Sequence, residues 1–114
     1  MVMLASADKD AGEKVFRRCK SCHSTNNGGK NKIGPNLWDV VERSKASASN
    51  YRFSKALGNL GGNWSYQDLD GFLINPKDFV KGTKMSFAGI KNAKDRADLI
   101  IYLRSLSDQP KPLP

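Results

Sequence analysis

Cys19-Lys20-Ser21-Cys22-His23 is the stretch around which this chain of 114 residues is organised. Two cysteines separated by two residues, with a histidine directly after the second, are typical of a c-type haem attachment site. The thiols add to the two vinyl groups of a porphyrin, and an imidazole nitrogen can then reach the iron. His23 is the only histidine of the chain, and Cys19 and Cys22 are its only cysteines. We therefore expect one covalently bound haem with His23 as an iron ligand.

Other interpretations of the cysteine pair fit the rest of the chain less well. A structural zinc site usually takes four Cys or His ligands, and this sequence has three in total. A thioredoxin-like redox pair is expected beside a βαβ pattern, and no strand-like run flanks this pair. A local disulfide and two unrelated thiols remain as alternatives.

The charge of the chain narrows the choice of partner. Nineteen Lys and Arg residues against 11 Asp and Glu residues give a formal net charge of +8. Such a field favours an acidic partner, which could be a protein docking face, a nucleic acid or an anionic membrane. No apolar run approaches the length needed to span a bilayer, so we expect the chain as given to be soluble.

The chain is short enough for one domain at most, flanked by two atypical ends. Residues 1–7 include Ala5-Ser6-Ala7, which fits the small-residue pattern of a signal cleavage site. We expect these residues to be disordered or to be the remnant of a signal or of a membrane anchor removed from the N-terminus. The domain is expected over residues 8–107. Residues 108–114 form a Pro-rich tail that should be extended or disordered.

The spacing of apolar residues predicts helices joined by long loops and no strand, so the fold class is all-α. The first helix is expected over Asp8–Lys20, with Asp10 as its N-cap. Ser65 is a good N-cap for a second helix, and Asn75-Pro76 predicts the start of another. The last helix is expected over Asp95–Leu106, and four to five helices are expected in all.

Met85 is the candidate for the second iron ligand. It lies in a loop bounded by Gly82 and Gly89, between the last two predicted helices. A thioether suits haem iron, and His/Met ligation raises the reduction potential. A lone methionine more often fills a gap in a core, so the neighbouring residues have to decide between the two.

These motifs, read in chain order, resemble those of class I cytochromes c, in the group of mitochondrial cytochrome c and bacterial cytochrome c2. The resemblance extends from Gly12 to Leu106. It rests on Gly12 and Phe16, Cys19 to His23, Gly34-Pro35-Asn36-Leu37, Arg43, Trp64, Asn75-Pro76-Lys77, Gly82 to Met85, Phe87 to Lys91, and Arg96 to Ile100 with Tyr102-Leu103.

The resemblance implies a small cytochrome c fold, in which the N- and C-terminal helices cross and long loops wrap around the haem. Gly12 and Phe16 would let the first helix cross the last near Leu99 and Tyr102. It also implies a haem site of seven residues. In it, Cys19 and Cys22 bind the porphyrin, His23 and Met85 bind the iron, the Pro35 carbonyl orients His23, and Arg43 and Trp64 hold a propionate.

Three positions depart from the mitochondrial pattern. Phe53 and Phe72 stand where that pattern usually has tyrosines, and Leu57 stands where it usually has asparagine. The tyrosine at the Phe72 position reaches the methionine sulfur in the family, and this chain has no hydroxyl there. We expect these differences to alter the tuning of the iron.

The function implied by the resemblance is that of a soluble one-electron carrier, not an enzyme, which shuttles electrons between membrane respiratory complexes. Quinol–cytochrome c reductase and cytochrome c oxidase, or a photosynthetic reaction centre, are the expected partners of a monomer that binds no nucleic acid. The expected compartment is the periplasm or the equivalent mitochondrial intermembrane space. The basic residues expected to meet an acidic docking face are Arg18, Lys20, Lys30, Lys32, Lys77, Lys84 and Lys91.

Two other classes of function remain open from the sequence. A haem-c enzyme or gas-sensing module would need Met85 to be labile, so that a small molecule could reach the iron. A basic nucleic-acid-binding protein would use the positive charge without haem, but the chain has no recognised binding motif.

Overall fold

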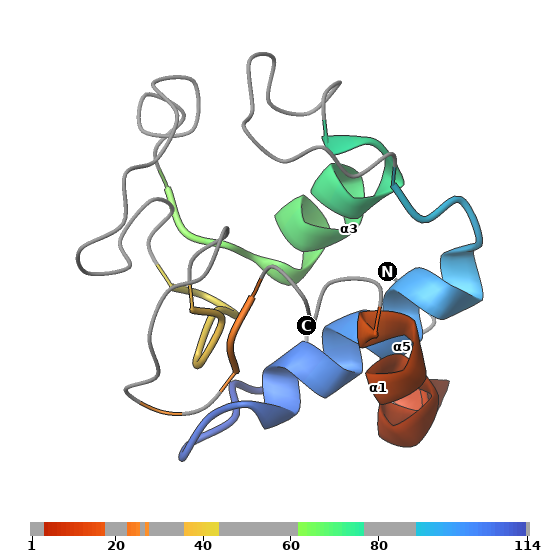
Figure 1. Ribbon diagram of the computed structural model, residues 1–114. Helices are drawn as coiled ribbons and strands as arrows, with labels where there is room; N and C mark the ends of the chain where they lie inside the picture. The colour runs from red at the N-terminus through yellow and green to blue at the C-terminus, as the bar shows by residue number, and fades with distance from the viewer. Residues whose placement is uncertain are drawn as a thin grey trace.

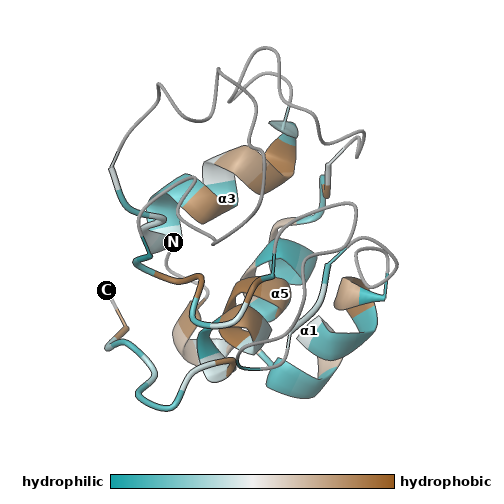
Figure 2. Ribbon diagram, turned by 60° about the vertical axis from the view of Figure 1, so that its left-hand side comes forward, coloured by the Kyte–Doolittle hydropathy of each residue, from teal (hydrophilic) through white to brown (hydrophobic). Residues whose placement is uncertain are grey.

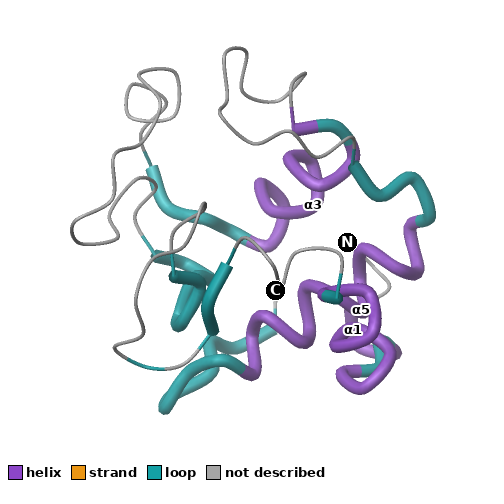
Figure 3. Tube along the Cα trace, in the orientation of Figure 1, coloured by secondary structure: helices purple, strands orange, loops and turns teal. Residues whose placement is uncertain are grey.

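The computed structural model describes residues 4–17, 23–25, 27, 36–43, 62–76 and 89–113. These ranges contain the 3-10 helix η1 (Leu4–Ser6) and the α-helices α1 (Lys9–Phe16), α3 (Tyr66–Ile74) and α5 (Ala93–Ser105), and they contain no strand (Figures 1 and 3). The predicted all-α class is confirmed. Pro76 is helical as expected, but the residues after it lie outside the described ranges.

α1 and α5 cross closely, as Figure 1 shows. Gly12 is at the crossing, where a Cβ would overlap the backbone carbonyl of Asp98 and lie 2.9 Å from the Cβ of Tyr102. Phe16, one turn further along α1, packs on the same residue of α5, with its ring centroid 5.4 Å from that of Tyr102. The crossing of the two terminal helices at Gly12 and Phe16 is therefore confirmed.

The N-terminus of α1 differs from the prediction. Asp8, not Asp10, is the N-cap, and its carboxylate accepts hydrogen bonds from the backbone N–H of Asp10 at 2.9 Å and of Ala11 at 3.4 Å. The backbone of Asp8 is extended, and its own N–H donates to the Asp98 carboxylate at 2.9 Å. A tertiary contact with α5 thus selects the cap. Beyond Arg17, residues 18–20 of the predicted helix lie outside the described ranges.

The other two helices also begin at caps. Ser65 caps α3 as predicted, because its Oγ accepts a hydrogen bond from the Asp68 backbone N–H at 3.0 Å. α5 begins two residues before the predicted Asp95, because Asn92 is its N-cap and accepts from the Asp95 backbone N–H at 3.1 Å. An asparagine side chain at this position satisfies a backbone donor that would otherwise have no partner within the helix.

In the part that is described, both ends of the chain make contacts with the rest of the molecule. Leu4 is only 3% exposed and packs with the core, and residues 4–6 form η1. At the other end, the backbone carbonyl of Lys111 accepts hydrogen bonds from two side chains. The expected character of residues 1–7 and of residues 108–114 stays a prediction.

The core lies between α3, α5 and the turn at residues 36–43. Ile100 and Leu99 of α5 are almost completely buried, and Leu69 and Leu73 form the buried side of α3. Apolar residues gather on α3 and α5, whereas α1 is mostly hydrophilic on its outer side (Figure 2). The helices thus hold in place the turn at residues 36–43 and Trp64, which belong to the candidate site.

Candidate haem site

Four of the residues that the sequence assigns to the site or to docking lie in the described part of the chain: His23, Arg43, Trp64 and Lys91. The roles of the others remain predictions. They are Cys19, Cys22, Pro35 and Met85 of the site, and Arg18, Lys20, Lys30, Lys32, Lys77 and Lys84 of the docking surface.

His23 begins a short segment that lies beside the residues following Pro35. The Ser24 carbonyl accepts a hydrogen bond from the backbone N–H of Leu37 at 2.9 Å. The Ser24 hydroxyl accepts a second one from the side-chain amide of Asn36 at 2.8 Å. These bonds join the segment after His23 to Asn36, the residue that follows Pro35 in the sequence, whose carbonyl is predicted to orient the imidazole.

The same segment is tied to the helix crossing through Tyr102 of α5. Burial raises the pKa of Tyr102 above its usual value, the Glu13 carboxylate adds to this, and a side-chain hydrogen bond with Thr25 opposes both. Thr25 is two residues after His23. The aromatic side chain that packs on Phe16 therefore also holds the loop of the predicted iron ligand.

Arg43 lies at the end of a tight turn over residues 36–43. Asp39 and Glu42 have φ angles of 58° and 66°, in the left-handed region that residues other than glycine rarely adopt. Neighbouring backbone holds both. The Asp39 N–H donates to the Leu106 carbonyl at 2.6 Å, and the Glu42 N–H donates to the Trp64 carbonyl at 2.7 Å.

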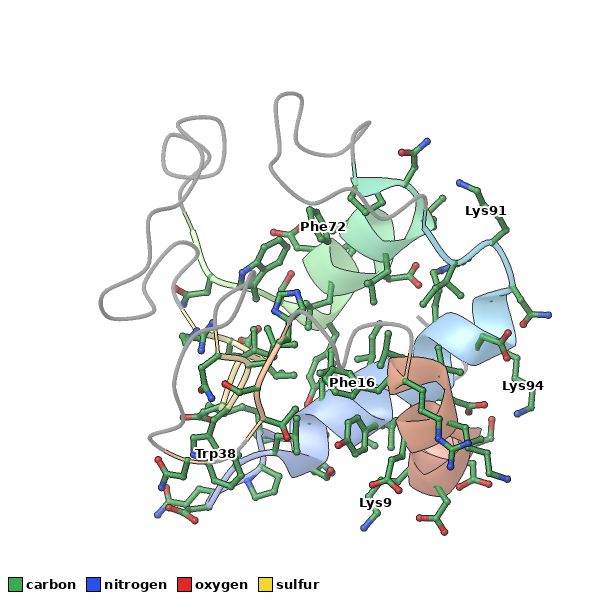
Figure 4. The ribbon with its side chains drawn as sticks, in the orientation of Figure 1. Lys9, Phe16, Trp38, Phe72, Lys91 and Lys94 are labelled. Atoms are coloured by element: carbon green, nitrogen blue, oxygen red, sulfur yellow. The ribbon has the colours of Figure 1, made fainter. Side chains whose placement is uncertain are left out.

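Trp64 is paired with this turn through its backbone and with α3 through its ring. Its N–H donates to the Arg43 carbonyl at 2.8 Å, so the two residues expected to act together are adjacent. The indole is 7% exposed, and its centroid lies 5.1 Å from the ring of Phe72 in an edge-to-face contact. Figure 4 places the half-buried Phe72 on α3.

The guanidinium of Arg43 is partly buried and incompletely paired. Its Nη1 donates to the carbonyls of Asn36 at 3.0 Å and of Trp38 at 3.1 Å. Its Nε is also buried, and it has no hydrogen-bond partner within the described ranges. Burial lowers the pKa of Arg43, and the Asp39 carboxylate partly offsets this effect.

A buried donor without a partner costs about 1–3 kcal/mol, and more when the group is charged. An anionic acceptor beside Arg43 would remove this cost. A haem propionate is a carboxylate, so the chemistry of Arg43 and its position beside Trp64 fit the group predicted from the attachment motif.

The chain that follows the Met85 segment is fastened to α3. The Ile90 N–H donates to the Leu73 carbonyl at 2.7 Å. The exposed Lys91 donates from its Nζ to the Ile74 carbonyl at 2.7 Å. At Gly89, where φ is 110°, a Cβ would overlap the Ile74 carbonyl, so this close approach requires glycine.

Arg96 and Asp70 complete this attachment. Neither residue was assigned a role from the sequence. Arg96 Nη1 donates to the carbonyls of Ile90 at 3.0 Å and Lys91 at 2.9 Å. Its Nε donates to the Asp70 carboxylate at 2.8 Å. No pattern in the sequence singles out Arg96, because it stands among Lys94, Asp95 and Asp98 in the charged first turns of the last helix. A buried arginine nevertheless requires such partners.

The described ranges offer neither a metal cluster nor a membrane-spanning helix. They contain no group of three or more His, Cys, Asp or Glu side chains that could hold a metal ion. They also contain no helix that is both long enough and apolar enough to cross a membrane.

Comparison with known proteins assigns the chain to a family. The family model described as cytochrome c matches residues 10–107. A cytochrome c homolog of Bradyrhizobium diazoefficiens is 44% identical over 98% of this chain and 61% of its own length. A cytochrome c of Theileria parva is 45% identical over 95% of this chain and 94% of its own length.

A solved structure gives the same result. Cytochrome cH from Methylobacterium extorquens superposes with a TM-score of 0.81 at 44% identity, covering 87% of this chain and 99% of that protein. The chain spans about three fifths of the length of the first bacterial relatives, including a cytochrome c homolog of Rickettsia bellii that is 47% identical over 90% of this chain. The fold, the attachment motif and these matches together show that the chain belongs to the cytochrome c family.

Proposed function

We propose that the protein is a one-electron carrier, and not an enzyme, with one haem c whose iron is bound by His23 and Met85. The family implies covalently attached haem. The observation in this chain that supports it best is the buried Nε of Arg43, which lacks a partner within the described ranges. Haem iron with two axial protein ligands can change between its ferrous and ferric states but offers no open position to a substrate.

Each residue of the site has a task in this proposal. Cys19 and Cys22 bind the porphyrin covalently and prevent its exchange. The Pro35 carbonyl accepts the second N–H of His23, which fixes the tautomer and direction of the imidazole. Arg43 donates to a propionate, and the contact of Trp64 with Phe72 helps to keep water from that side.

We further propose that residues 8–107 form the cytochrome c domain. The protein is proposed to work as a monomer in the periplasm or an equivalent compartment, either diffusing freely or held on a membrane anchor. Respiratory membrane complexes are the proposed partners: quinol–cytochrome c reductase and cytochrome c oxidase, or a photosynthetic reaction centre. Lysines around the site favour an acidic docking face on them. In the described part of this surface, Lys91 is exposed and close to α3 (Figure 4).

A redox titration followed by visible absorption tests the proposal. The expected result is a covalently bound haem that titrates as one electron at high potential, with a weak band near the red edge of the ferric spectrum from sulfur ligation. Met85→Ala should abolish that band and lower the potential. A high-spin ferric wild-type protein would instead identify a haem enzyme or a gas sensor, and a colourless protein would exclude both.

A further inference from the structure

The C-terminal tail, residues 106–113, lies against the turn that contains Arg43, although nothing in the proposed function uses it. In Figure 1 the dark blue chain leaves the end of α5 and lies beside the yellow turn at residues 36–43. The contacts of the tail come from three parts of the molecule: α3, α5 and this turn.

The main chain of the tail is held at Lys111. Its carbonyl accepts a hydrogen bond from the Tyr66 hydroxyl at 3.0 Å and another from Arg104 Nε at 2.6 Å. Tyr66 is the first residue of α3 and is 6% exposed, and Arg104 is in the last turn of α5. Ordering one residue of an extended segment costs about as much as one such bond contributes, so loss of a single bond should release the tail.

The tail holds Asp39 at two points. The Lys111 ammonium lies 3.3 Å from the Asp39 carboxylate, and the Leu106 carbonyl accepts the Asp39 N–H at 2.6 Å. Asp39 has a φ of 58°, and a residue other than glycine keeps such a conformation only where its surroundings impose it. The tail supplies these surroundings.

Asp39 connects the tail to Arg43. The Asp39 carboxylate opposes the lowering of the Arg43 pKa by burial, so the two charges interact. The guanidinium also donates to the Trp38 carbonyl at 3.1 Å, directly before Asp39. Movement of Asp39 would therefore displace both the charge and the hydrogen-bond acceptor that fix the Arg43 side chain.

We propose that the C-terminal tail is a strap that positions Arg43, with Tyr66 and Lys111 as its positioning residues. The inference rests on the proposed function, because Arg43 is the residue assigned to a haem propionate. It assigns a role in tuning the redox centre to a segment outside the haem-binding residues.

The first test is amide hydrogen exchange in the haem-loaded protein. Tyr66→Phe keeps the buried ring and removes only the hydroxyl, and Lys111→Met removes only the charge. Both should accelerate exchange of the Asp39, Glu42 and Trp64 N–H groups by about tenfold or more, while Leu99 and Ile100 of α5 exchange as in the wild type. Lys14→Met is the matched control, because it removes one exposed lysine charge from α1.

The second test is the reduction potential as a function of pH. A guanidinium beside a carboxylate keeps the pKa of the carboxylate low. Displacement of Arg43 should raise the pKa of the propionate, so the potential of Tyr66→Phe and Lys111→Met should fall as pH rises through the neutral range. The potentials of the wild type and of Lys14→Met should stay nearly constant there.

Three results would distinguish failure of the strap proposal from failure of the proposed function. Unchanged exchange at Asp39, Glu42 and Trp64, or an unchanged pH profile of the potential, would overturn the strap. Equal acceleration in α5 would show a general loss of stability, which also overturns it. A wild-type protein without His/Met-bound haem would instead refute the proposed function, and the exchange experiment would still report whether the tail holds the turn.

Discussion

The buried carboxylate of Asp98 connects the beginning of α1 to α5. It is 1% exposed, and its two oxygens accept the Asp8 backbone N–H at 2.9 Å and the Lys94 ammonium at 2.8 Å. Burial raises the pKa of Asp98, but these two hydrogen bonds and the charge of Lys94 outweigh it, so the pKa lies below its usual value. The ionised side chain thus joins the N-cap of α1 to α5.

Asp98→Asn should reduce the free energy of unfolding at pH 7 by about 1–3 kcal/mol, because Lys94 loses its acceptor while the amide oxygen still reaches Asp8. The folded pKa is lowered, so the contribution is fully present above the ordinary value of 3.8 and is lost as pH falls through the folded pKa. Urea unfolding of both proteins should show the difference shrinking on acidification. Asp95→Asn, which removes a partly exposed carboxylate of the same helix, should show no such convergence.

Phe72 is a second residue with a specific expected effect. The resemblance implies a tyrosine at this position that donates to the methionine sulfur, and Phe72 has no hydroxyl to do so. In the proposed site we therefore expect the sulfur of Met85 to give more electron density to the iron. Phe72→Tyr should raise the reduction potential by about 20–60 mV, the equivalent of one hydrogen bond for a one-electron couple. Phe16→Tyr, at the helix crossing, is the control. A fall or no change in potential for Phe72→Tyr would contradict this explanation.

At the scale of elements, the α1–α5 crossing requires a glycine. In an exposed helix Gly12→Ala would stabilise by about 1 kcal/mol. Here the Cβ overlaps the backbone carbonyl of Asp98, which cannot rotate away. Overpacking costs about 1–3 kcal/mol, so the variant should unfold at lower urea concentration than the wild type. Glu13→Ala is the neighbouring control on the exposed side, and a stabilised Gly12→Ala protein would mean that the helices separate easily.

The elements also show what the sequence could predict. The apolar spacing and the Ser65 cap identified α3, and the glycine at position 12 marked the crossing. The cap of α1 lies two residues before the predicted Asp10, because Asp8 is selected by Asp98, which is distant in sequence. α5 starts two residues before the predicted Asp95, because its cap Asn92 precedes the periodic region. A pattern within a short stretch of sequence cannot indicate a partner that is distant in the chain.

The same limit applies to the site. The resemblance predicted that Arg43 and Trp64 hold a propionate together. The structure joins the two residues through a backbone hydrogen bond, and their contact with a propionate stays a prediction. Two other contacts depend on side chains that meet only after folding. Lys111 of the tail pairs with Asp39 of the turn, and Arg96 donates hydrogen bonds to the carbonyls of Ile90 and Lys91. Prolines in the tail predicted an extended or disordered chain, and composition alone does not reveal that the Lys111 carbonyl has two donors.

For the whole molecule, the net charge of +8 predicts how encounters depend on salt. If basic residues steer the protein to an acidic redox partner, the second-order rate of electron transfer should fall steeply between low and physiological ionic strength, where the Debye length shortens to about 8 Å. Stopped-flow measurement with an acidic partner tests this. Lys91→Glu should flatten the salt dependence more than Lys9→Glu on α1, and a rate independent of salt would exclude the docking model.

The position of α1 against α5 has a consequence for the order of events during synthesis. The hydrogen bond between Asp8 and Asp98 joins residues 90 positions apart. A helix of eight residues is too short to be stable in isolation. We therefore expect α1 to remain unfolded until the last helix has been made. In the proposed function the haem is attached at Cys19 and Cys22, which come soon after α1 in the sequence. We therefore expect the interval before α5 is completed to leave both thiols accessible for haem attachment.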